Sequence, residues 1–290
     1  MKVGAFFPPV SLENTDIAWQ SPYTITWSAM NSWIGEDIRA MGGELTSKYR
    51  YDGGDVAVGG AVFLGGDLSG TILNDRGWSM HDRATGLFDR VTKPANSSAF
   101  QPRGDITPFK ELDNSPGAYV FVRGEDENIG GEFLITAFDN FTDESATSRG
   151  RGAWRTRFLS GGVGYFLPFD VELIAQALIG ETERRAPSGL RLDDSFAAGF
   201  LMLSVFADED EKHRLSLRHD RFRVNDRIGA GVRRERGSAW TAAYSYRPDD
   251  YHRLSVELLS IDSTRPSREA TGVSADQRDT TLQTSYRFSF

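Results

Sequence analysis

The chain ends in the stretch Thr280–Phe290, TTLQTSYRFSF, in which apolar and polar side chains alternate. One face of this stretch carries Leu282, Thr284, Tyr286, Phe288 and Phe290. The other face carries Thr281, Gln283, Ser285, Arg287 and Ser289. A period of two residues is typical of a β-strand with one apolar and one polar face. The C-terminal stretch therefore predicts a strand and supplies the pattern to look for in the rest of the chain.

The same alternation recurs in about twelve segments of strand length. Clear examples lie near 171–182, 240–247 and 253–258, and further strands are predicted near 2–8, 37–51, 54–66, 116–126, 131–142, 153–166, 194–207 and 211–224. In 116–126 and 194–207 both faces are apolar, so the alternation is weaker there. Because no Pro/Gly/Ser-rich linker divides the sequence, residues 1–290 are expected to form a single all-β domain.

The links between these segments alternate in length. Short links lie at 51–54, 126–130, 167–170, 207–210 and 247–250, and long links lie at about 9–36, 67–115, 143–152, 182–193, 225–237 and 263–279. Such sorting is typical of an antiparallel up-and-down transmembrane β-barrel, with tight turns on the periplasmic side and long loops outside. A β-sandwich has no reason to sort its loops in this way. An even strand number, with both ends on the periplasmic side, is consistent with the same topology.

The overall composition agrees with a barrel wall but does not require one. The 290 residues are 39% hydrophobic, and the mean hydropathy is −0.41. No run approaches the roughly 20 apolar residues of a membrane-spanning helix, whereas a barrel strand needs only one apolar face. The net charge of −8 argues against a nucleic-acid partner. The absence of cysteine excludes disulfides and thiolate metal sites, and no metal or other cofactor is expected.

No arrangement of residues in the sequence indicates catalysis. The four histidines are His81, His213, His219 and His252. The adjacent pairs His81–Asp82 and His219–Asp220 would point to opposite faces of a strand, so neither forms a ready dyad. We therefore expect no catalytic residue and no enzyme activity. The alternatives left open are a soluble all-β binding barrel, a surface adhesin and, less favoured, an outer-membrane barrel hydrolase.

The long link at about 67–115 is the candidate constriction loop of a pore. A loop of this length is uncommon in a compact domain unless it has a function. Its candidate residues of mixed charge are Arg76, His81, Asp82 and Arg83. Folded inward, they would set a field across the passage. The alternative is a solvated cap over the outer surface.

Charged residues opposite the apolar strand faces are predicted to line the interior. These candidates are Arg214, Arg218, Asp220, Arg247, Arg253 and Arg287. Arginines in a wet channel lower the electrostatic barrier for anions, unless they pair with carboxylates and only stabilise the wall. Arg155 and Arg157 fall near the exterior rim, where they could contact lipopolysaccharide phosphates or line the mouth.

The opposite faces of the same strands are predicted to point outward. The residues expected to be exposed there are Leu215, Leu217, Trp240, Tyr244, Leu254, Val256, Leu258, Leu282, Tyr286 and Phe288. Their aromatic members are plausible parts of interfacial girdles.

Several stretches resemble a known family. Residues 2–13, KVGAFFPPVSLE, resemble the "VGxFxxPxSLE" signature of the phosphate-selective porin O and P family. RGWSMHDR at 76–83, WRTRF at 154–158 and HRLSLRHDRF at 213–222 are similar to stretches of porin-like proteins of Gram-negative bacteria. This resemblance implies a barrel of about sixteen strands, commonly a homotrimer, through which small anions or other polar solutes diffuse passively.

The resemblance also implies a location and partners. In that family the signature follows a signal peptide and several earlier strands, so we expect this chain to lack about four strands. The expected location is the outer membrane, with its lipid and lipopolysaccharide as partners. A terminal Phe290 preceded by aromatic residues at alternate positions resembles the signal read by the outer-membrane assembly machinery.

Overall fold

A computed structural model describes most of the chain. The described residues are 1–38, 40–64, 73, 76–84, 115–143, 147–148, 151–152, 154–185, 191–229, 231 and 233–289. Most of the loop predicted at 67–115, and Phe290, lie outside these ranges.

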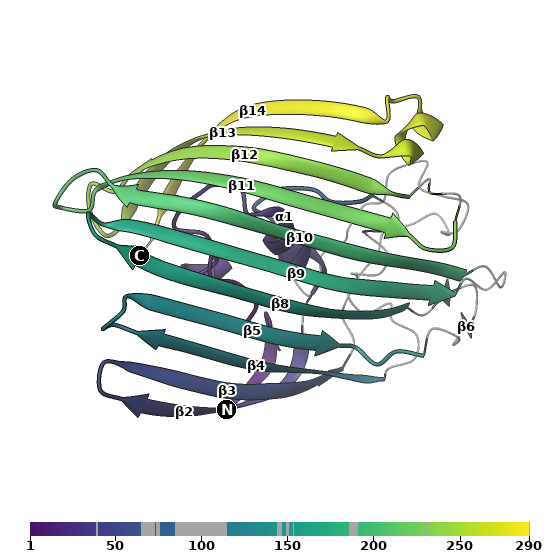
Figure 1. Ribbon diagram of the computed structural model, residues 1–290, viewed down its shortest axis with the longest axis horizontal. Helices are drawn as coiled ribbons and strands as arrows, with labels where there is room; N and C mark the ends of the chain where they lie inside the picture. Colours follow the sequence, from purple (N-terminus) through teal and green to yellow (C-terminus); the bar gives the residue numbers. More distant parts are fainter. Residues whose placement is uncertain are drawn as a thin grey trace.

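Twelve antiparallel strands form one sheet in which each strand pairs with the next along the chain (Figure 1). They are β1 (Lys2–Phe6), β2 (Ala40–Tyr51), β3 (Gly54–Leu64), β4 (Pro116–Asp126), β5 (Gly131–Asp139), β8 (Trp154–Leu167), β9 (Val171–Arg185), β10 (Arg191–Phe206), β11 (His213–Asp226), β12 (Glu235–Tyr246), β13 (His252–Thr264) and β14 (Asp276–Phe288). The predicted all-β, up-and-down order is confirmed.

The remaining elements are short. They are the ribbon β6 (Thr147–Ser148) and β7 (Arg151–Gly152), the helix α1 (Ala29–Asp37), and the 3-10 turns η1 (Ile17–Trp19) and η2 (Pro266–Thr271). None of the helices in the described ranges is long and apolar enough to cross a membrane. The sheet order runs from β1 to β14, and these two strands do not pair with each other in the described residues.

The five predicted short links are tight connections, and they lie together at one end of the sheet (Figure 1, left). The link predicted at 182–193 is wrong in extent. The ladder between β9 and β10 continues to the pair Arg185 and Arg191, so only residues 186–190 connect them. An ion pair of 2.7 Å between Arg191 and Glu183 joins the two strands near this end.

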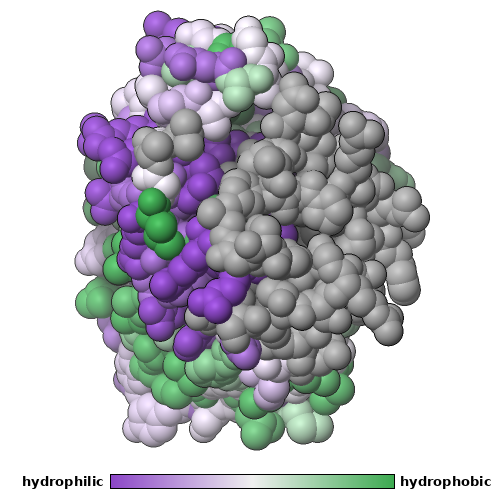
Figure 2. Space-filling view, turned by 90° about the vertical axis from the view of Figure 1, so that its right-hand side faces the viewer, coloured by the Kyte–Doolittle hydropathy of each residue, from purple (hydrophilic) through white to green (hydrophobic). Residues whose placement is uncertain are grey.

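The outer face of the sheet is apolar and uncovered. All ten side chains predicted to point outward are exposed, with exposed fractions between 39% and 70%. The same face continues on other strands with Val120, Ile135, Leu159, Val163, Ile179 and Leu201. Figure 2 looks onto the end with the long links, where hydrophilic residues gather left of the middle and hydrophobic ones appear along the lower margin. The predicted assignment of faces is therefore confirmed.

The prediction of an exterior loop at 9–36 is wrong. Residues 8–38, called the inner segment from here on, lie against the inner face of the sheet, and α1 packs on β10 and β11. Trp27, Met30 and Ile34 are fully buried. The physical reason is that this segment is too apolar to remain solvated, and the inner wall offers it apolar partners.

Those partners explain why the 194–207 stretch is apolar on both faces. Phe196, Phe200 and Met202 of β10 are buried on the inner face, whereas Leu201 and Leu203 are exposed on the outer face. Trp33 of α1 contacts Phe196 with ring centroids 5.0 Å apart, and Phe158 of β8 at 5.6 Å. These apolar residues would be unfavourable in an interior filled with water. Here they form a core with the inner segment.

Replacing Phe158 with Ala should lower the free energy of unfolding by about 3–5 kcal/mol, because it removes a buried ring between Trp33 and Phe138. Leu159, the next residue on the same strand, points outward and is 49% exposed. Leu159→Ala should change the free energy of unfolding by less than about 0.5 kcal/mol. Guanidinium chloride unfolding followed by tryptophan fluorescence compares the two, and equal losses would contradict the assigned faces.

Candidate functional site

The inner segment is tied to the wall through its backbone. Glu257 of β13 accepts hydrogen bonds from the N–H groups of Ile25 and Thr26, at 2.6 and 3.1 Å. On the other side of the segment, Gln176 of β9 accepts from the N–H of Leu12 at 2.9 Å. A buried N–H without a partner costs about as much as a lost hydrogen bond. The polar residues of the inner face therefore fix the path of the segment.

Arg218 of β11 is the centre of a buried ion network. Its guanidinium binds the carboxylates of Glu13, from the inner segment, and Asp220, which lies 2.8 Å away. The same group donates to the Thr26 carbonyl at 2.8 Å and to the Thr24 hydroxyl at 2.9 Å. Arg218, Glu13 and Asp220 are all fully buried. Such charges are tolerated only when they are paired and hydrogen-bonded.

The start of α1 completes this network. Ser28 caps the helix by accepting from the N–H of Asn31, and the N–H of Ser28 itself donates to Glu13 at 3.0 Å. Asp220 accepts from the N–H of Ala29 at 3.0 Å. Carboxylates are favoured at a helix N-terminus, where free N–H groups and the helix dipole are positive. The helix therefore begins where the two carboxylates stand.

Three more of the predicted arginines contact the inner segment. Arg253 and Arg287 lie opposite each other on β13 and β14, and both donate to the carbonyl of Ser21. Arg253 also forms an ion pair of 2.8 Å with Asp16. Arg214 lies 4.8 Å from the ring centre of Tyr23, within cation–π range. Arg247 is exposed beyond the end of β12.

The described part of the predicted constriction loop also reaches the inner segment. Arg76 and His81 both bind Glu36 of α1, with His81 Nε2 at 2.9 Å and Arg76 Nη1 at 3.1 Å. The carbonyl of His81 accepts from the N–H of Trp27. Asp82 and Arg83 are exposed. The structure thus brings Arg76 and His81 together and leaves the two following residues at the surface.

Several residues that hold this site were not singled out from the sequence. They are Glu13, Glu36, Gln176 and the inner segment as a whole. A signal for α1 was present, because Met30, Trp33 and Ile34 have the spacing of one helix face. No local pattern indicates the partners across the sheet.

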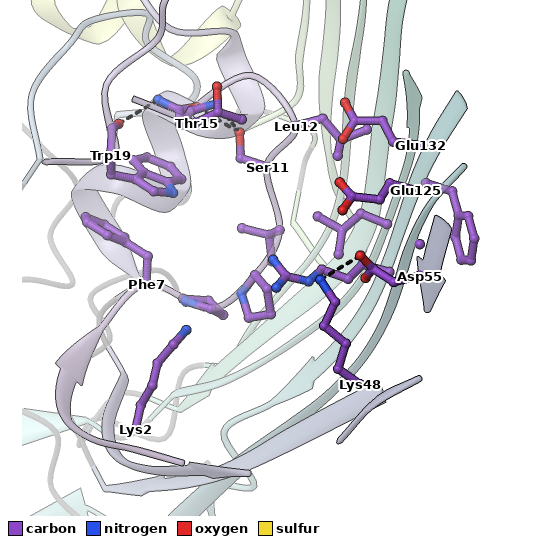
Figure 3. Close-up of a pocket in the computed structure, with 18 residues that line it drawn as sticks. Lys2, Phe7, Ser11, Leu12, Thr15, Trp19, Lys48, Asp55, Glu125 and Glu132 are labelled. Atoms are coloured by element: carbon purple, nitrogen blue, oxygen red, sulfur yellow. Dashed lines mark hydrogen bonds and ion pairs between the residues drawn. The ribbon is translucent and has the colours of Figure 1, made fainter. Parts of the chain in front are cut away.

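A hollow of about 440 Å³ remains between the inner segment and the wall formed by β2 to β5 (Figure 3). On the segment side, Phe7 and Trp19 stack with their ring centroids 4.4 Å apart. On the wall side lie Glu125, Glu132 and the ion pair between Lys48 and Asp55, of 2.6 Å. The hollow therefore offers an aromatic surface opposite polar groups of both signs.

Comparison with known proteins assigns no family, because no family model and no curated protein matches the chain. Within the described ranges, no group of three or more histidine and acidic side chains could hold a metal ion. What the arrangement can do is bind charged and polar groups inside a sheet whose outer face is apolar.

Substituting Met for Arg218 should free the inner segment, because it leaves Glu13 and Asp220 buried without their cation. Removing one partner of a buried ion pair costs about 3–5 kcal/mol. Hydrogen exchange at the N–H groups of Ile25, Thr26 and Ala29 should accelerate strongly. Arg191→Met, which removes a surface ion pair, is the control and should leave those rates unchanged. Equal exchange in both variants would contradict the anchoring role.

The contact between α1 and residues 76–81 should depend on pH. Burial raises the pKa of Glu36, but hydrogen bonds from His81 and Arg76 outweigh it and hold the pKa at about 2. Because this value is below the ordinary 4.5, the contact adds stability above about pH 4.5 and loses it as pH falls toward 2. Between pH 4.5 and pH 2, the free energy of unfolding should fall more steeply with pH in the unmodified protein than in Glu36→Gln. Parallel curves would contradict this.

Proposed function

We propose that the chain forms the wall of an outer-membrane porin that lets small polar solutes diffuse passively, with the inner segment narrowing the interior. The observation that carries this proposal is the continuous apolar outer face, on which the ten side chains predicted to point outward are all exposed. Monomeric soluble proteins rarely expose apolar patches of such extent. Alternation of an apolar outer and a polar inner face is the pattern of outer-membrane barrels.

Aromatic residues on the outer face support the same location. They gather near the end with the short turns, where Tyr49, Tyr51, Tyr165, Tyr244, Tyr251, Tyr286 and Phe288 are exposed. Two of their hydroxyls contact histidines, Tyr244 with His213 and Tyr286 with His252, each at 2.7 Å. Aromatic rings with a polar tip are enriched at the headgroup level of membranes. These residues would form the girdle on the periplasmic side.

A wall in a bilayer has no open edge. The proposal therefore requires the edges of β1 and β14 to be paired, either with each other or with the further strands of the barrel of about sixteen strands that the family resemblance implies. The homotrimer, the contact with the assembly machinery and the association with lipopolysaccharide belong to the same proposal. The permeant solutes are small and polar, with a mild preference for anions from Arg214 and Arg247 near the short turns.

Purified protein added to planar bilayers should give stepwise ion conductance. Replacing residues 11–36 with a short Gly-Ser linker should raise the conductance of each step, because this removes the segment that covers the inner face. Circular dichroism should show that strand content is retained in the variant. A protein that leaves the bilayer silent, or a variant with unchanged conductance, would contradict the proposal.

The anion preference has its own test. Arg214 and Arg247 are less buried than Arg218, so their charge can be reversed without breaking the buried network. The variant carrying Arg214→Glu and Arg247→Glu should shift the reversal potential toward cations, because luminal charges tune selectivity more than stability. Glu209→Lys, at an exposed turn on the same end, is a control for unspecific charge effects. An unchanged potential would remove the assigned role of these arginines.

A further inference from the structure

Three arginines on the outer face stand close together near the end with the long links. Arg221 and Arg223 lie on β11, and Arg236 of β12 is directly opposite Arg223 in the ladder. All three are exposed, and from here on they are called the outer arginines. Like charges directly opposite each other on paired strands are destabilising, with Cβ atoms only about 5 Å apart.

Several other arginines on this rim are neutralised by ion pairs, and these three are not. Arg155 pairs with Asp139, and Arg157 and Arg227 both pair with Glu181. Among the described residues, no ion pair is formed by the outer arginines. A nearby carboxylate, Asp262, pairs with Arg278 instead. The positive charge of the cluster is thus available to a group from outside the chain.

The outer arginines border a groove of about 900 Å³ across β9 to β14. Its floor is made of small residues, Ala177, Ala197 and Gly199, and Ile179 stands beside them. A second hollow of about 580 Å³ adjoins it and shares Ile179, Ala197 and Arg223. On the next outward positions of β10 and β12, Leu201 and Trp240 continue the apolar face. Two carboxylates also line the groove, and both have partners: Asp262 pairs with Arg278, and Asp276 accepts from the Thr264 hydroxyl. The groove therefore joins a rim that carries three arginines to an apolar floor.

We propose that this groove binds a membrane lipid with a phosphorylated headgroup, the phosphates on the outer arginines and an acyl chain along the floor. The inference rests on the proposed membrane location and assigns a lipid site to it. Guanidinium groups bind phosphate oxygens in a bidentate, charge-assisted geometry, which also relieves the repulsion between Arg223 and Arg236. A free anion would use the arginines but not the floor. The combination of the two matches a lipid.

The test measures binding in detergent micelles, so that it does not depend on pore conductance. Native mass spectrometry of the purified chain with bisphosphorylated lipid A should show a bound lipid. The triple variant Arg221→Gln, Arg223→Gln, Arg236→Gln should weaken binding about tenfold or more, since a single charge-assisted hydrogen bond already accounts for such a factor. Arg191→Gln, on the same rim but paired with Glu183, should bind like the unmodified protein.

Two further measurements distinguish a bound lipid from a free phosphate ion. Ala197→Trp fills the floor without changing charge and should also weaken lipid binding, whereas inorganic phosphate at millimolar concentration should not displace the lipid. Unchanged strand content by circular dichroism establishes that each variant is folded. Equal lipid binding by the triple and unmodified proteins would overturn the proposal, and so would complete displacement by phosphate, which would indicate a simple anion site. Absent conductance with retained, arginine-dependent lipid binding would reject the porin but not this site.

Discussion

The structure depends on pairing the buried charges of a polypeptide segment that lies inside a sheet and on hydrogen-bonding its backbone N–H groups to the wall. Arg218 meets this requirement at the centre, where it joins Glu13 of the inner segment to Asp220 of the wall, and Glu257 and Gln176 meet it at the sides. An uncompensated charge at this depth would cost about 3–5 kcal/mol, as much as the loss of one large side chain from the core. The inner segment and the wall therefore pack as one unit.

This unit explains the two different faces of the sheet. The inner face alternates polar anchors with apolar residues such as Phe196 and Met202, because it must hold both the backbone and the apolar side chains of the inner segment. The outer face is exposed and predominantly apolar over its middle. The two ends of this face differ. Aromatic residues lie near the short turns, and arginines lie near the long links. A sheet surrounded by a bilayer, with headgroups at both ends, would require this distribution.

The charged side chains of the interior hold the inner segment in place, and in the proposed porin they would also set its selectivity. Arg218, Arg253 and Arg287 form their hydrogen bonds with the inner segment. In the proposed porin, a solute would therefore meet Arg214, Arg247 and the mixed groups of the hollow beside β2 to β5. In the proposed porin, the position of the inner segment would set both the width and the charge of the passage. Residues 76–81 add a second contact to α1 through Glu36, and the lowered pKa of this carboxylate predicts that the contact weakens in acid.

The sequence alone determined the strands, their order and their faces, because a period of two residues and the lengths of the links are local properties. It also identified Arg218, Asp220, Arg253 and Arg287 as inward-facing, since each lies opposite an apolar position. Only the tertiary structure decided that residues 8–38 turn inward and that these arginines bind them. Contacts such as Leu12 with Gln176 and Arg218 with Glu13 join residues more than 160 positions apart. No local pattern encodes them, because they exist only once the curved wall has brought its inner face around the segment.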